Sequence, residues 1–286
     1  MRCIFCKSSS GSSRSMEHII PKALGNDVHV LGAGWVCDQC NNYLARKVEE
    51  PFLSTQYGKL SRFEMGVPNR RGRTPIVSGF HLGSRTKLDF QYTEQGLAFS
   101  ATSEEDERRL IGALKTQCNG TFILPASEVP KVSYELARFI GMIALEALAY
   151  RCMDVEGWNQ ELVDNESFDE LRNYVRRGRP GFVWPIHIRQ IYPANFEFSD
   201  ATSPSFQVLH EFDFLCLQSQ ETPGQIDEMF AVIAIFGIEY TINLGGPEIE
   251  GFLEWLDTNG HASYLYSKND KQNKAEQATP NGAPVL

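Results

Sequence analysis

The sequence predicts an α+β fold in which a small N-terminal module precedes a larger mixed α+β domain. Three observations support this prediction. Two Cys-x-x-Cys pairs lie within the first 40 residues, and Leu44, Val48 and Phe52 recur at helical spacing after the second pair. From residue 76 onward, segments with strand and helix character alternate. A chain of 286 residues has room for both parts.

The two cysteine pairs, Cys3 with Cys6 and Cys37 with Cys40, predict a metal site. Each Cys-x-x-Cys turn presents both sulfurs to one point, so two such turns can surround one Zn²⁺ tetrahedrally. Disulfides are the alternative, but the total of seven cysteines is odd and the N-terminus is polar rather than an apolar leader. We therefore predict one structural zinc, because a module this small cannot bury enough apolar surface alone.

A strand and then a helix are predicted within the module. Ile19 and Ile20 are β-branched and suit a strand, and Pro21 and the nearby glycine end it. The segment DQCNNYLARKVEEPFL has an apolar residue at every fourth position. Pro51 predicts the end of this helix. The metal would hold the helix against the strand region.

The segments EHIIPKALG and CDQCNNYLARKVEEPF, with the first cysteine pair before them, resemble the HNH endonuclease family over residues 3–53. They are similar to a small bacterial subgroup with two Cys-x-x-Cys zinc knuckles. The resemblance implies a ββα-metal fold, a β-hairpin and a helix around one divalent ion. It also implies hydrolysis of phosphodiester bonds in nucleic acid, with DNA favoured, and the family is associated with bacterial defence.

Three residues match the family's functional positions. His18 is the candidate general base, because a neutral histidine can take a proton from water near neutral pH. Glu17 and Asn41 supply oxygen ligands and match the positions that bind the catalytic Mg²⁺ or Mn²⁺. Adjacent strand residues point to opposite sides, so a bulge or turn is needed if Glu17 and His18 share one site.

Each assignment has a structural alternative. His18 can be a hydrogen-bonded structural histidine, and Asn41 can simply cap the helix. Glu49 lies eight residues after Asn41, near the same helix face, and is either a brace for the site or an exposed carboxylate. The family's middle asparagine, which orients the histidine, lies a few residues before the second cysteine pair. Here only Asn26 lies between the pairs, and it comes early, so a backbone carbonyl is the alternative partner of His18.

The charge is divided unevenly along the chain. Residues 1–75 contain 11 Lys/Arg and 6 Asp/Glu, which gives +5, whereas residues 76–286 contain 16 and 30, which gives −14. Arg70, Arg71 and Arg73, with Lys59 and Arg62 before them, form a basic run. The run either neutralises phosphates or is a solvated linker.

The predicted domains are a zinc-containing nuclease module over 1–65, a basic linker over 66–75, an α+β domain over 76–266 and a flexible tail over 267–286. The strongest helix is 132–152, whose charged residues and length favour a buried core helix over a membrane span. Further helices are expected at 103–117, 156–178 and 247–256. Strands are expected within 75–101, 182–191, 205–218 and 229–244, the last as a central strand or a hairpin.

Three classes of function remain. The favoured one is a metal-dependent nuclease in the cytoplasm, with the larger domain choosing substrate or partner. The second is a non-catalytic zinc module that binds nucleic acid. The third is a protein-interaction scaffold, in which the acidic domain binds a protein partner or associates with itself. No membrane association is expected.

Overall fold

The computed structural model describes residues 1–69, 72–116, 120–194, 196–199, 207–219, 222, 224–266 and 279–280. They form two compact units, each discontinuous in sequence. Unit 1 contains Met1–Pro21, Asn26–Phe52 and the described part of Lys131–Leu286. Unit 2 contains Lys22–Gly25 and the described part of Leu53–Pro130. The units therefore divide the chain differently from the predicted boundaries at 65 and 76, and the assignment of functional domains stays a prediction.

A two-stranded hairpin and a helix form the N-terminal part of unit 1, as predicted. Strand β1 (Glu17–His18) pairs antiparallel with β2 (Val30–Leu31). Helix α1 (Asp38–Leu44) begins after Cys37, whose sulfur accepts a hydrogen bond from the Cys40 N–H at 3.4 Å. Four residues at helical spacing, Cys40, Leu44, Val48 and Phe52, form the buried side of this helical segment.

The helix passes through Pro51 instead of ending there, so that prediction is wrong. A π-helical turn η2 (Ala45–Glu49) follows α1, and α2 (Glu50–Leu53) continues beyond the proline. Pro51 has no N–H to donate to the carbonyl of Lys47, four residues earlier, and its ring crowds that carbonyl. The Arg138 guanidinium donates to the Lys47 carbonyl at 3.1 Å. A distant side chain therefore compensates for the proline within the helix.

The central sheet of unit 1 has four antiparallel strands in the order β7-β11-β10-β9. They are β7 (His187–Gln190), β9 (His210–Gln218), β10 (Ile226–Ile235) and β11 (Ile238–Asn243). The long apolar segment thus forms a hairpin at the centre of the sheet. Gly237 in its turn has φ +78°, and a Cβ there would lie 2.1 Å from the Tyr192 carbonyl oxygen, so the turn requires glycine.

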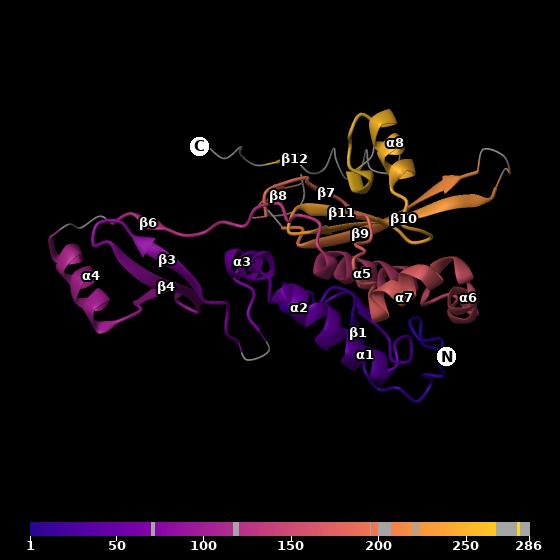
Figure 1. Ribbon diagram of the computed structural model, residues 1–286, viewed down its shortest axis with the longest axis horizontal. Helices are drawn as coiled ribbons and strands as arrows, with labels where there is room; N and C mark the ends of the chain where they lie inside the picture. Colours follow the sequence, from indigo (N-terminus) through magenta and orange to yellow (C-terminus); the bar gives the residue numbers. More distant parts are fainter. Residues whose placement is uncertain are drawn as a thin grey trace. The chain divides into compact units, whose positions relative to one another are not determined.

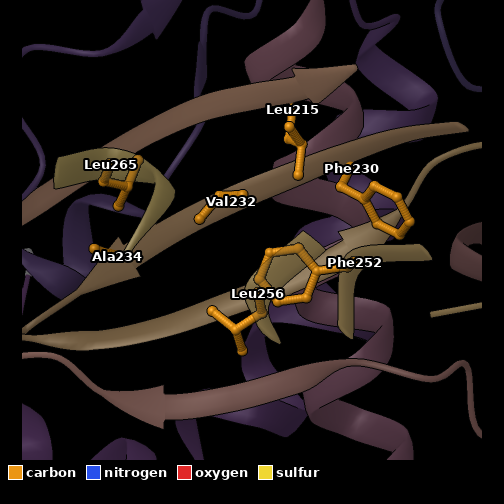
Figure 2. Close-up of a cluster of buried hydrophobic side chains, with 7 residues drawn as sticks. All are labelled: Leu215, Phe230, Val232, Ala234, Phe252, Leu256 and Leu265. Atoms are coloured by element: carbon orange, nitrogen blue, oxygen red, sulfur yellow. The ribbon is translucent and has the colours of Figure 1, made fainter. Parts of the chain in front are cut away.

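Helices cover both faces of this sheet (Figure 1). Helix α8 (Glu250–Thr258) and the 3₁₀ turn η4 (Tyr264–Tyr266) pack on one face. Figure 2 shows the apolar cluster between this face of the sheet and the two helical elements. Alternate residues of β10 contribute to the cluster. Its members are Leu215, Phe230, Val232, Ala234, Phe252, Leu256 and Leu265. Helix α5 (Tyr134–Cys152) contacts β10 and β11 and covers the other face.

Helix α5 is the buried core helix that the sequence predicts. Every residue from Leu136 to Ala149 is buried, including the charged Arg138 and Glu146. A Cβ on Gly141 would lie 2.9 Å from a methyl carbon of Val175, so glycine permits close packing of α7. The predicted helix over 156–178 is divided into α6 (Trp158–Asp164), η3 (Glu166–Phe168) and α7 (Asp169–Arg177), because Asn165 starts a new turn with its side chain.

Unit 2 contains the turn η1 (Lys22–Leu24), helices α3 (Gln56–Glu64) and α4 (Glu104–Thr116), and a sheet in the order β5-β4-β3-β6. The strands are β3 (Val77–His81), β4 (Thr86–Thr93), β5 (Gly96–Ala101) and β6 (Phe122–Ile123). Its core consists of Leu60, Phe63, Val77, Leu88, Phe90 and Leu110.

Two short strands, β8 (Phe198–Ser199) and β12 (Thr279–Pro280), pair with each other. The remainder of the predicted tail from residue 267 lies outside the described residues. Among the helices that the structure describes, none is long and apolar enough to cross a membrane.

Candidate functional site

The four cysteines of the two pairs converge, as the zinc prediction requires. Their sulfurs all lie within 4.8 Å of one another, and the Cys6 and Cys37 sulfurs are 3.7 Å apart. All four are free thiols. A hydrogen bond from the Cys40 thiol lowers the pKa of Cys3 to about 4. Four cysteine sulfurs around one point are a donor set that suits tetrahedral Zn²⁺.

The first knuckle is held against helices of the larger part of unit 1. The Arg2 backbone N–H donates to the Asn159 side chain at 2.9 Å, and the Asn159 amide donates back to the Arg2 carbonyl at 3.0 Å. Lys7 pairs with Asp169 at 2.6 Å. These contacts join the cysteine site to α6 and α7, so the N-terminal module is integrated in unit 1.

Glu17 and His18, the two residues of strand β1, differ in how far their side chains are exposed. Its ladder with β2 is regular, with Glu17 opposite Leu31 and His18 opposite Val30. Adjacent side chains on a regular strand point to opposite faces. Glu17 is 8% exposed, whereas His18 is half-buried. Glu17 is therefore the more enclosed of the two side chains, and no bulge interrupts the two described pairs of this ladder, although a bulge or turn was expected for a shared site.

Asn26 holds the hairpin connection together with four hydrogen bonds to the backbone. Its Nδ2 donates to the carbonyls of Ile20 and His29 at 2.8 and 2.9 Å. Its Oδ1 accepts from the N–H groups of Val28 and His29 at 3.0 and 2.9 Å. The side chain is 2% exposed. The early asparagine of the sequence thus ties the end of β1 to the residues that enter β2.

The π turn brings Asn41 and Glu49 to one side of the helical segment. Two α-helical turns contain about 7.2 residues, and a π turn adds about one more, so an eight-residue spacing returns to the same face. Both residues are half-buried. Glu49 is therefore more enclosed than the exposed carboxylate of the alternative interpretation. The Asn41 N–H donates to the Cys37 carbonyl at 2.9 Å as part of the first turn of α1.

Glu146 on α5 is one of the charged residues within this largely apolar helix. It is completely buried, and within the described part of the chain neither of its carboxylate oxygens has a hydrogen-bond partner. Burial raises the pKa of Glu146 well above its usual range, and the nearby Glu17 and Glu49 carboxylates raise it further. We call Glu17, Glu49 and Glu146 the inner acid cluster. A charged residue at the centre of an apolar helix was the available signal.

A family model described as HNH endonuclease matches residues 3–56. Residues 3–56 are an HNH endonuclease domain. The match contains the four cysteines, the hairpin with Glu17 and His18, and the helix with Asn41. No curated protein and no solved structure matches the chain. The HNH domain ends before α5, so Glu146 lies outside the matched residues.

The basic run lies in unit 2, partly on α3 and partly in the segment that follows this helix. Lys59 and Arg73 are exposed, whereas Arg62 is half-buried and its pKa is lowered by burial. Arg70 and Arg71 lie outside the described residues. The phosphate-binding role of this run stays a prediction.

Proposed function

We propose that this protein is a metal-dependent HNH endonuclease that hydrolyses phosphodiester bonds in DNA. His18 acts as the general base, and Glu17 and Asn41 hold a catalytic Mg²⁺ or Mn²⁺. The HNH domain over residues 3–56, with its converged cysteines, is the observation that carries the proposal. One Zn²⁺ on Cys3, Cys6, Cys37 and Cys40 keeps the hairpin and the helix together.

The residues around Glu17 and Asn41 suit a divalent ion. Carboxylate and amide oxygens are the ligands that Mg²⁺ and Mn²⁺ prefer. Glu146 lies near the Glu17 and Glu49 carboxylates, and its own oxygens have no protein partners among the described residues. When bound, such an ion neutralises charge that develops on the leaving 3′ oxygen.

His18 suits the role of a base that activates water. It is half-buried, so the imidazole is held by the strand and still reaches solvent. A neutral imidazole accepts the proton of an attacking water near neutral pH and makes that water a stronger nucleophile. Asn26 positions the strand that carries His18 by tying the ends of the hairpin connection.

A cleavage assay tests this proposal. The zinc-loaded protein is incubated with plasmid, linear duplex and single-stranded DNA, and with RNA, in the presence of Mg²⁺ or Mn²⁺. His18→Ala should reduce cleavage at least about 10²-fold with unchanged zinc content. His261→Ala, at an exposed histidine of unit 1, is the matched control and should retain cleavage. Equal cleavage by wild type and His18→Ala would remove His18 from the mechanism. No cleavage by the wild type would favour a non-catalytic zinc module that binds nucleic acid or protein.

A further inference from the structure

One face of α5 is directed toward the HNH domain. Near its start, Arg138 donates to the Lys47 carbonyl of η2. Near its end, the Tyr150 ring meets the His29 ring edge-on, with centroids 5.8 Å apart. Glu146 lies between these two contacts in sequence, one helical turn before Tyr150. Helix α5 contacts η2, which contains Glu49, and β2, which pairs with the strand that carries Glu17.

A buried carboxylate without a partner is costly, because it loses water and gains nothing in exchange. Glu239, the other fully buried glutamate among the described residues of unit 1, shows how a structural carboxylate is accommodated. It accepts a hydrogen bond from Arg189 at 2.6 Å and another from the Ser263 hydroxyl. Glu146 has neither kind of partner within the described residues. The buried cation on the same helix, Arg138, donates to backbone carbonyls instead.

Burial in this region falls from the interior toward the surface. Glu146 is completely buried and Glu17 is 8% exposed, whereas Asn41, Glu49 and His18 are half-buried. The oxygen donors among these residues therefore range from completely buried to half-buried. Among the described residues only the four cysteine sulfurs lie within 4.8 Å of one another as a group, so a cation shared by the three carboxylates requires rotation of their side chains.

We propose that Glu146 is a ligand of the catalytic divalent ion, supplied by a helix outside the HNH domain. The inference rests on the proposed function. Together with Glu17 it would give the ion two carboxylates, a number typical of Mg²⁺ and Mn²⁺ sites in nucleic-acid enzymes. The HNH domain of this protein then needs α5 to complete its metal site, and the unpartnered oxygens of Glu146 have a function.

The test measures metal binding separately from cleavage. Mn²⁺ is titrated into the zinc-loaded full chain by calorimetry, with Glu146→Gln, which keeps the shape and removes the charge. Glu135→Gln is the control, because it makes the same change on the first turn of the same helix. Glu146→Gln should weaken Mn²⁺ binding at least about tenfold. Without Mn²⁺ its melting temperature should stay close to that of the wild type, since the raised pKa of Glu146 already favours the neutral carboxyl group and glutamine keeps its shape.

Glu146→Gln with wild-type affinity for Mn²⁺ would overturn the inference while the proposed nuclease stands, provided that Glu17→Gln weakens binding. Loss of melting temperature in Glu146→Gln with unchanged Mn²⁺ affinity would also overturn it, because Glu146 would then be structural. A wild type that cleaves DNA and binds no Mn²⁺ or Mg²⁺ would overturn both the metal role of Glu146 and that of Glu17.

Discussion

The ring of Phe52 stacks on the ring of Phe139, with centroids 4.1 Å apart and planes inclined by 13°. Phe52 closes the helical segment of the HNH domain, and Phe139 lies on α5. Both rings are buried, with exposed fractions of 4% and 0%. The HNH domain and α5 therefore share one hydrophobic core, and the stability of one depends on the other.

Replacement of Phe52 by alanine should lower the free energy of unfolding by about 3–5 kcal/mol, because it leaves a cavity against Phe139. Urea denaturation of the zinc-loaded protein measures this difference. Tyr43→Ala on α1 is the control, since Tyr43 is 37% exposed, and its loss should stay below about 1 kcal/mol. If Phe52→Ala and Tyr43→Ala lowered the free energy of unfolding equally, the stacking of Phe52 on Phe139 would not join the HNH domain and α5 in one core.

Removal of zinc should destabilise unit 1 beyond the HNH domain. A Cys3→Ser variant cannot complete the four-sulfur site, and the knuckle that carries Arg2 and Lys7 would lose its anchor on α6 and α7. Elemental analysis should find about one zinc per wild-type chain and less in the variant. Hydrogen exchange should show faster exchange in α6 and α7 as well as in α1. Faster exchange confined to residues before 53 would contradict this coupling.

Asn26→Ala should lower the free energy of unfolding by at least about 2 kcal/mol, because four backbone groups of the hairpin connection each lose a hydrogen bond and only the His29 carbonyl keeps another donor among the described residues, the Ile19 N–H. Cleavage should fall as well, since the strand that carries His18 is no longer held. Asn42→Ala is the control. Its amide donates to the Asp38 carbonyl on the exposed side of α1, so the change should cost less than about 1 kcal/mol.

Acidification should weaken the contact between the hairpin and α5 through His29. Burial lowers the pKa of His29, and the positive charge of Arg151 lowers it further. The unfolded chain binds a proton near pH 6.5, whereas the folded chain binds it only at lower pH. The contribution of neutral His29 to the free energy of unfolding is therefore fully present above about pH 6.5. It is lost as the pH falls toward the lower pKa that His29 has in the folded protein.

His29→Phe keeps a ring between Tyr150 and Phe212 and removes this titration. Urea denaturation of wild type and variant at pH 7.5 and 5.5 measures the effect. The stability of the variant relative to the wild type should rise on acidification. Zinc release affects both proteins and cancels in the comparison. A difference independent of pH would show that His29 does not titrate between these values.

The local fold of the HNH domain could be predicted, because its features depend on residues close together in sequence. The paired cysteines predict the converged sulfurs, and the apolar period ending at Phe52 predicts the buried side of the helix. The core helix over 134–152 and the β10–β11 hairpin follow from apolar patterns in the same way. The catalytic roles of Glu17, His18 and Asn41 stay predictions.

Interactions between distant segments were not predictable. The sequence near Pro51 does not show that Arg138, 91 residues from Lys47, compensates for the missing N–H. Nor does the pattern of α5 reveal that Glu146 lies near Glu17 and Glu49, because a charged residue on an apolar helix has several ordinary explanations. Both contacts depend on the docking of the hairpin and helix against α5, which brings residues 1–52 and 131–266 into one unit.

Unit 1 consists of segments that lie far apart in the sequence, so its parts are synthesised at different times. Residues 1–52 leave the ribosome before the helix that covers their apolar side, and residues 53–130 are made in between. At roughly 5–20 residues per second, those 78 residues take about 4–16 s. During this interval the nascent chain can acquire zinc but has no α5 on which to bury Phe52. The metal is then the principal restraint on the hairpin and helix until the second half of their core emerges.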